Sequence, residues 1–257
     1  MLRSVLLCLT TVCLISQASA DDIADAALVI AVDVSGSMSA EELTIQRQGY
    51  VRALSGDAFG MAAASGPLGK VALTYIEWAD PGMQVLTVPW RIIDGPAAAQ
   101  AFAAELEARP VASGTNTSIS SALVFSAALF GDLPIQAERW IIDISGDGVN
   151  TAGPHVAPTR DRVVARGIVI NGLPVELADR TSDQVSGVEL AAYYRDCVIG
   201  GPGAFVLPVA GIDGIAAAVE RKMVREIAAA VPATPALVAA AAEPRADCTA
   251  GQKDFYE

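Results

Sequence analysis

A short polar stretch after an apolar run carries side chains that could bind a cation. Residues 28–33 read LVIAVD and continue into VSGSM, so Asp33 is followed by Ser35 and Ser37 at alternate positions. One carboxylate with two hydroxyls makes a small all-oxygen surface, which suits hard cations such as Mg²⁺, Mn²⁺ or Ca²⁺. Ser and Asp before a helix also act as simple caps, and the triplet alone does not separate the two roles.

Two later loops offer oxygen ligands of the same kind. The stretch SGTNTSISSAL places Thr115 and Thr117 just before a predicted helix, and ISGDGVN places Asp147 just after a buried strand. Loops at the carboxyl ends of neighbouring strands meet at one edge of a doubly wound sheet, where the winding direction changes. The sequence therefore predicts a divalent-cation site that these loops build together.

The remaining pattern supplies the elements that must position these loops. Apolar strands alternate with helical stretches, which predicts an α/β fold with a doubly wound, mostly parallel open sheet and helices on both faces. Ser39 is the expected N-cap of the first helix, and Asp80-Pro81-Gly82 is the turn of one antiparallel edge hairpin. The residues 221–226, RKMVRE, are expected to form a solvated helix face. Strands are expected at 28–33, 70–79, 83–90, 140–145, 167–175 and 204–209, and helices at 40–59, 96–108, 158–166, 183–194 and 212–230, with one more ending at 129.

The three loops resemble those of the von Willebrand factor type A domain. The metal-ion-dependent adhesion site of that family has the signature Asp-x-Ser-x-Ser, then a Thr, then an Asp. Residues 33–37 match its first part, and Asp147 in Gly-Asp-Gly matches its last. By the family's spacing the threonine is Thr117, with Thr115 as the alternative. The resemblance spans residues 27–230. Within the family, the chain is similar to a bacterial, exported branch with no assigned function.

The resemblance implies how such a site would be used. The implied ion is Mg²⁺, with Mn²⁺ or Ca²⁺ as alternatives, and its open position would take an Asp or Glu carboxylate of a protein partner. The chain would then be a protein-binding domain for adhesion or assembly. Asp143, a charge within RWIIDISGDG, departs from the family pattern; it either accepts a hydrogen bond that orients the serines or Asp147, or it makes a buried structural hydrogen bond. The implied metal ligands are Asp33, Ser35, Ser37, Thr117 and Asp147.

An enzyme is not expected, although a hydrolase using the same metal and a domain with a purely structural metal remain alternatives. His155 is the only histidine and lies in a loop rich in Gly and Pro. No serine has the Gly-x-Ser-x-Gly context of a nucleophile elbow. A phosphatase of the aspartyl-phosphate type would need a second Asp where Ser35 stands.

The ends of the chain predict export. Residues 1–20 combine Arg3, an apolar run and the ending Ala18-Ser19-Ala20, the layout of a secretory signal peptide. We expect a periplasmic or secreted protein with one domain over residues 21–231 and an Ala/Pro-rich tail over residues 232–257. The apolar part of that tail is too short to span a bilayer, so no stable membrane insertion is expected.

Cysteine content and charge complete the prediction. Two of the four cysteines, Cys197 and Cys248, remain after signal cleavage, and in an oxidising compartment they are expected to form one disulfide that ties back the tail. Lys and Arg number 17 against 29 Asp and Glu, a net charge of −12. Such an acidic field disfavours nucleic acid and anionic membrane surfaces, and it suits metal cations and protein partners.

Overall fold

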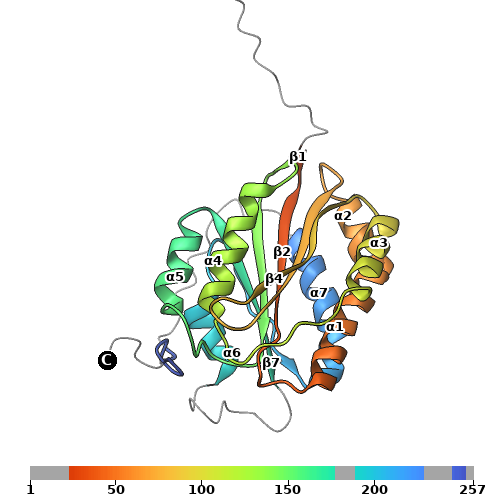
Figure 1. Ribbon diagram of the computed structural model, residues 1–257. Coiled ribbons are helices and arrows are strands. Elements are labelled where there is room, and N and C mark those ends of the chain that lie inside the picture. The colour runs from red at the N-terminus through yellow and green to blue at the C-terminus, as the bar shows by residue number, and fades with distance from the viewer. Residues whose placement is uncertain (1–22, 177–188, 229–244, 253–257) are drawn as a thin grey trace, which may run out of the picture.

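The fold is built on a six-stranded sheet in the order β4-β3-β2-β6-β7-β8, held between two layers of helices (Figure 1). The computed structural model describes residues 23–176, 189–228 and 245–252. β3 and β4 pair antiparallel and the other neighbours in this sheet pair parallel, which confirms the predicted doubly wound sheet with one edge hairpin. The strands are β1 Ile23–Ala24, β2 Ala26–Asp33, β3 Val71–Trp78, β4 Gln84–Ile93, β5 Gln136–Ala137, β6 Trp140–Gly146, β7 Ile168–Glu176 and β8 Val209–Ala210.

Alternate side chains of β2 divide between the two helical layers. Leu28, Ile30 and Val32 pack with residues of α1, α2, α3 and α7, whereas Ala27 and Val29 pack with residues of α4, α5 and α6. Burial on both faces explains the continuous apolar run of this strand. The α-helices are α1 Ala40–Ser55, α2 Asp57–Ala64, α3 Pro96–Glu107, α4 Ile119–Leu129, α5 Val156–Val164, α6 Leu190–Tyr193 and α7 Ile215–Ala228, and shorter turns are η2 Phe130–Asp132, η3 Tyr194–Val198 and η4 Ile212–Gly214.

The sheet changes its winding direction at β2. This strand lies between β3 and β6, so the chain builds the sheet outward from β2 in both directions. Asp33, the last residue of β2, pairs with Trp78, and Val32 pairs with Ser145 on the other side. The loops after β2 and β6 therefore leave the sheet side by side, as expected for a ligand-binding edge.

Two expected elements differ most in extent from the prediction. The first helix was expected to continue to residue 59, but it ends before Gly56, whose ψ of 163° is extended, and α2 begins after it. The strand expected at 204–209 is reduced to β8 and one isolated bridge from Val206 to Gly172. Pro208 lacks the N–H that a longer ladder would need.

The expectation of a solvated face at residues 221–226 is wrong. Lys222 and Met223 are fully buried, and Glu226 is buried as well. Polar side chains of α7 point towards the sheet because the sheet carries a charged partner. Lys222 Nζ lies 2.5 Å from Asp143 Oδ1 on β6. Of the helix expected at 183–194, the part up to residue 188 lies outside the described residues, and the remainder forms α6 and the π-helical turn η3.

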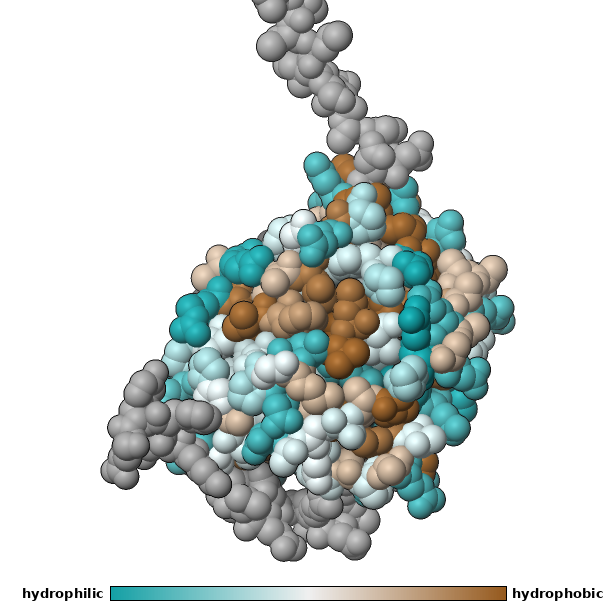
Figure 2. Space-filling view, viewed as in Figure 1, coloured by the Kyte–Doolittle hydropathy of each residue, from teal (hydrophilic) through white to brown (hydrophobic). Residues whose placement is uncertain are grey.

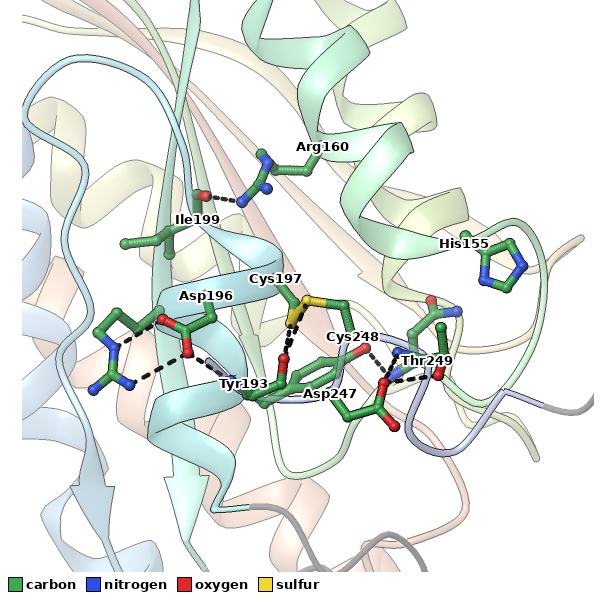
Figure 3. The surroundings of a disulfide bond; sticks show 12 residues. His155, Arg160, Tyr193, Asp196, Cys197, Ile199, Asp247, Cys248 and Thr249 are labelled. Carbon is green, nitrogen blue, oxygen red and sulfur yellow. Dashed lines mark hydrogen bonds and ion pairs between the residues drawn. A yellow bond between two sulfur atoms is a disulfide. The ribbon is translucent and has the colours of Figure 1, made fainter. Parts of the chain in front are cut away.

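A disulfide joins η3 to residues 245–252. Cys197 and Cys248 are bonded, with 5.4 Å between their Cα atoms, as the cysteine count predicts. Figure 3 shows the bond beside Tyr193, with Asp247 and Thr249 joined by hydrogen bonds nearby. Asp196 Oδ2 accepts a hydrogen bond of 2.8 Å from Ala246 N, which adds a second link between the two segments.

Edge strand β4 leaves apolar side chains in contact with solvent. Val85 and Leu86 are 41% and 43% exposed, and Val124 on α4 is 51% exposed. Figure 2 shows apolar surface gathered near the middle of the face that carries α4 and β4. Because Gln84 pairs with Trp78, and Trp78 with Asp33, the exposed pair on β4 lies at the same end of the sheet as the polar loops.

Candidate metal centre

The first loop is fixed at both ends. Ser39 and Glu42 form a capping box at the start of α1, with Ser39 Oγ accepting from Glu42 N at 3.2 Å, which confirms the predicted cap. Gln46 of the same helix donates from Nε2 to the Asp33 carbonyl at 2.8 Å. Within the loop, Ser35 N donates to Asp33 Oδ1 at 2.8 Å. These bonds hold the buried carboxylate of Asp33 at the strand end.

The second loop brings the Thr117 hydroxyl to the first. Thr117 Oγ1 donates to Ser35 Oγ at 3.2 Å, and the Thr117 side chain is buried. The next residue is anchored too, because Ser118 N donates to the Ala79 carbonyl at 2.8 Å, while Gly114 N donates to the Val34 carbonyl at 2.9 Å. The segment between these anchors therefore lies directly against the Asp-x-Ser-x-Ser loop.

Thr115 has a different place. Its side chain is exposed, and its backbone N donates to Asp80 Oδ2 at 2.9 Å. Asp80 also accepts from Asn116 N and Nδ2, at 3.1 and 2.6 Å. These hydrogen bonds lower the pKa of Asp80, and the bond from Thr115 N has the largest effect. The hairpin turn thus holds the threonine loop by its backbone and leaves Thr117 as the inward hydroxyl.

The third loop closes the arrangement. Ser37 Oγ donates to Asp147 Oδ1 at 2.5 Å, and Ser35 Oγ lies 3.1 Å from Ser37 Oγ. Thr117 is held from this side too, because Thr151 Oγ1 accepts from Thr117 N at 3.0 Å. The structure therefore links the predicted hydroxyls and Asp147 in one chain of contacts, with Asp33 at its inner end.

The electrostatics of this cluster favour a cation. Asp33 has no exposed surface, and burial, followed by the charge of Asp147, raises its pKa well above the usual range. Its Oδ2 has no hydrogen-bond partner among the described residues. A divalent ion would offset both negative charges, and carboxylate and hydroxyl oxygens are the ligands that a hard cation prefers. The residues present therefore fit such an ion.

No other metal-binding cluster competes with this one in the described ranges. Groups of three or more His, Cys, Asp or Glu side chains suited to a metal are absent there. Asp143, the departure from the family pattern, is paired with Lys222 in the core, and its described contacts include none of the loop side chains. His155 is exposed, and its Nδ1 lies 2.7 Å from Gln252 Oε1.

Sequence reasoning missed the residues that support the site. Gln46 lies on a helix face that reads as ordinary polar surface, and its contact with the Asp33 carbonyl depends on how α1 packs. Asp80 reads as a turn residue, and Thr151 as part of a Gly-rich loop. Asp80 in its Pro-Gly turn was the one available signal for these supporting residues, because a carboxylate in such a turn can accept hydrogen bonds from backbone N–H groups of a neighbouring loop.

The order of the sheet and the helices on both of its faces give the chain the fold of von Willebrand factor type A domains. The chain belongs to the family described as "Protein of unknown function (DUF1194)", whose model matches residues 22–231. A comparison with curated proteins gave no match.

Solved structures with this fold come from proteins of several kinds. The pilus adhesin SpaC from Lactobacillus rhamnosus GG has a TM-score of 0.56 at 15% identity, over 80% of this chain and 31% of its own. Proximal thread matrix protein 1 from the mussel byssus, with a zinc-occupied MIDAS motif, has a TM-score of 0.52 at 13% identity, over 80% of this chain and 48% of its own. The SpRpn10 VWA domain has a TM-score of 0.51 at 10% identity, over 76% and 94%. The chain thus spans about a third of the adhesin and about half of the thread protein, and these likenesses establish the fold alone.

Proposed function

We propose that the chain is a protein-binding domain that uses a divalent cation, with Mg²⁺ as the preferred ion and Mn²⁺ or Ca²⁺ as alternatives. The ion would be held by Asp33, Ser35, Ser37, Thr117 and Asp147. The observation that carries this proposal is the bond between Ser37 Oγ and Asp147 Oδ1, at 2.5 Å across 110 residues of sequence. Two loops so far apart in the chain present oxygens to one point, and the third adds Thr117 through Ser35.

A protein partner with an Asp or Glu carboxylate fits this site. Two carboxylates balance the charge of a divalent ion, and a six-coordinate cation can keep a position for an outside oxygen. A carboxylate there would be attracted locally despite the acidic net charge of −12. The exposed Val85 and Leu86 at the same end of the sheet add apolar surface of the kind found at protein interfaces.

Binding is preferred over catalysis because the described residues around the site offer no uncommitted group to act as a base. Asp33 and Asp147 are both committed to the ion in this proposal, and the contact of the His155 ring is with Gln252. The fold that this domain shares with a pilus adhesin and a thread matrix protein is compatible with a binding role. Nucleic acid is not proposed as a partner, because an acidic protein repels phosphates.

We further propose that residues 1–20 direct export and that the protein works in the periplasm or outside the cell. The N-terminal pattern supports this, as does the Cys197–Cys248 disulfide, because such bonds persist in oxidising compartments. None of the helices in the described ranges has the length and apolarity to cross a bilayer.

Metal binding is tested by thermal unfolding in EDTA and in Mg²⁺ or Mn²⁺. The parent protein is expected to melt at a higher temperature with metal, since a ligand that binds the folded state stabilises it. Asp33→Ala should abolish the rise and keep a folded apo form, whereas Asp132→Ala, which changes an exposed carboxylate after α4, should behave as the parent. An Asp33→Ala protein that responds to metal like the parent would contradict the site.

Partner binding is tested by affinity capture from an envelope extract. A captured protein should be released by EDTA and should not bind the Asp147→Ala variant, and changing its contacting Asp or Glu to Asn or Gln should abolish capture. Retention by both EDTA-treated and Asp147→Ala protein would mean that another surface is used. Metal stabilisation without any metal-dependent capture would favour the structural alternative, and turnover in a screen of phosphate esters and peptides would favour the hydrolase.

A further inference from the structure

The ring of Tyr194 lies against the middle of β7 and the carboxyl end of β6, and a glycine on each strand makes room for it. A Cβ added at Gly172 on β7 would lie 2.7 Å from Tyr194 Cδ1. A Cβ added at Gly146 on β6 would lie 2.8 Å from the Tyr194 hydroxyl oxygen. Both distances are too short for a real side chain, so the ring reaches from β7 over β6 only because these residues are glycines.

The hydroxyl of Tyr194 points into the space above Gly146, which the carboxylate of Asp33 also faces. The same added Cβ at Gly146 would lie 2.7 Å from Asp33 Oδ2. The phenol oxygen and the carboxylate oxygen therefore flank one point above β6. Asp33 and Tyr194 are both fully buried.

Neither oxygen has a hydrogen-bond partner among the residues that the structure describes. Asp33 Oδ1, in contrast, is already used by Ser35 N. A buried polar atom without a partner is costly, and proteins satisfy most such atoms directly or through an ordered water. A phenol can donate and an ionised carboxylate can only accept, so the two groups are complementary.

We propose that Tyr194 is a positioning residue of the metal centre. Its hydroxyl donates to Asp33 Oδ2, directly or through one buried water, and holds the carboxylate in the orientation that a cation needs. Each carboxylate oxygen has two acceptor positions, so Asp33 keeps lone pairs for the ion or its water while bonded to Tyr194 and Ser35. This inference rests on the metal binding proposed above. Outer groups of this kind orient metal ligands and tune the affinity of the site.

The backbone that carries Tyr194 supports this role. Tyr194 begins the π-helical turn η3, and π-turns occur often at functional sites. Cys197 in the same turn is bonded to Cys248, which anchors η3 to residues 245–252. The tyrosine thus reaches the site from an element that lies outside the three polar loops and is held by the disulfide.

The test compares Tyr194→Phe with Tyr75→Phe by calorimetric titration of the exported protein with Mn²⁺. Tyr75 is a matched control, because it is also fully buried and its hydroxyl also lacks a hydrogen-bond partner in the described structure. Its ring, however, faces Arg47 on the other side of the sheet. We expect Tyr194→Phe to weaken Mn²⁺ binding by about tenfold or more. In EDTA the variant should remain folded, because Phe keeps the buried ring and loses only the hydroxyl. Tyr75→Phe should bind Mn²⁺ as the parent does.

A Tyr194→Phe protein that binds Mn²⁺ with the parent's affinity would overturn the role of Tyr194 and leave the metal centre standing. A parent that binds no divalent cation would overturn both. Should Tyr194→Phe fail to fold, a crystal structure of the parent with Mn²⁺ decides: the Tyr194 oxygen must contact Asp33 Oδ2 or a water bonded to it. A tyrosine without either contact would refute the proposal.

Discussion

Lys222 Nζ lies 2.5 Å from Asp143 Oδ1, and both side chains are buried between α7 and the sheet. The same ammonium lies 2.6 Å from Glu226 Oε1, one helical turn further on. Glu226 Oε1 also accepts from Asn171 Nδ2 on β7 at 3.0 Å. One cation and two carboxylates therefore tie the last helix to β6 and β7 inside the core.

Removal of the ammonium is expected to destabilise the fold strongly. Lys222→Met would leave the buried carboxyl groups of Asp143 and Glu226 without their cation, and breaking a buried ion pair in this way costs about 3–5 kcal/mol. Urea unfolding at neutral pH measures the loss. The triple variant Lys222→Met, Asp143→Asn, Glu226→Gln removes the charges together and should recover much of the stability. A Lys222→Met protein as stable as the parent would show that the cluster contributes nothing to the fold.

The same cluster predicts a pH dependence of stability. Burial, and then the charge of Asp143, raise the pKa of Glu226 to about 8. A raised folded-state pKa means that the proton stabilises the fold at low pH and that this contribution is lost as the pH rises from the unfolded value through about 8. The free energy of unfolding should therefore fall over this window, by at most about 1.4 kcal/mol per pH unit.

Glu226→Gln tests this dependence, because the amide stays neutral at every pH. Urea unfolding across the window should show a flatter slope for this variant than for the parent. Glu107→Gln, a change at the exposed end of α3, serves as the control and should keep the parent's slope. Equal slopes for the parent and Glu226→Gln would mean that Glu226 carries no proton in the folded protein.

The fold could be predicted from sequence because its main signals are local. The apolar run of β2, the Ser39 cap and the Asp80-Pro81-Gly82 turn each indicate an element from a few neighbouring residues. The break at Gly56 was missed because a single Gly inside a helical pattern is often tolerated. The short β8 was missed because pairing next to Pro208 depends on tertiary contacts.

Only those residues of the candidate site that belong to the sequence motif could be predicted. The motif and its spacing indicated Asp33, Ser35, Ser37 and Asp147, which the structure brings together, and favoured Thr117 over Thr115 without deciding between them. The partners of buried polar groups could not be predicted from the sequence, because they depend on how the elements pack together. Lys222 read as a surface charge although Asp143 pairs with it, and nothing near Tyr194 in sequence points to Asp33.

The disulfide is expected to contribute substantially to stability. Cys197 and Cys248 are separated by 51 residues, and closing a loop of that length stabilises the fold by about 4 kcal/mol in the chain-entropy model. The double variant Cys197→Ser, Cys248→Ser should lose a comparable free energy of unfolding, and the parent should lose it under reducing conditions. Mass spectrometry of a non-reduced digest should find the linked peptide. Two free thiols in the exported protein would contradict the prediction.

The two threonines of the second loop provide the last prediction, a matched pair two residues apart. Thr117 Oγ1 bonds to Ser35 Oγ inside the site, whereas the Thr115 side chain is exposed and only its backbone is held, by Asp80. Thr117→Ala should therefore weaken Mn²⁺ binding in a calorimetric titration by about tenfold or more, as loss of a group at a metal centre does. Thr115→Ala keeps the backbone bond to Asp80 and should bind Mn²⁺ as the parent does. The reverse result, weak binding by Thr115→Ala and normal binding by Thr117→Ala, would assign the ligand to Thr115 and require the loop to rearrange when the ion binds.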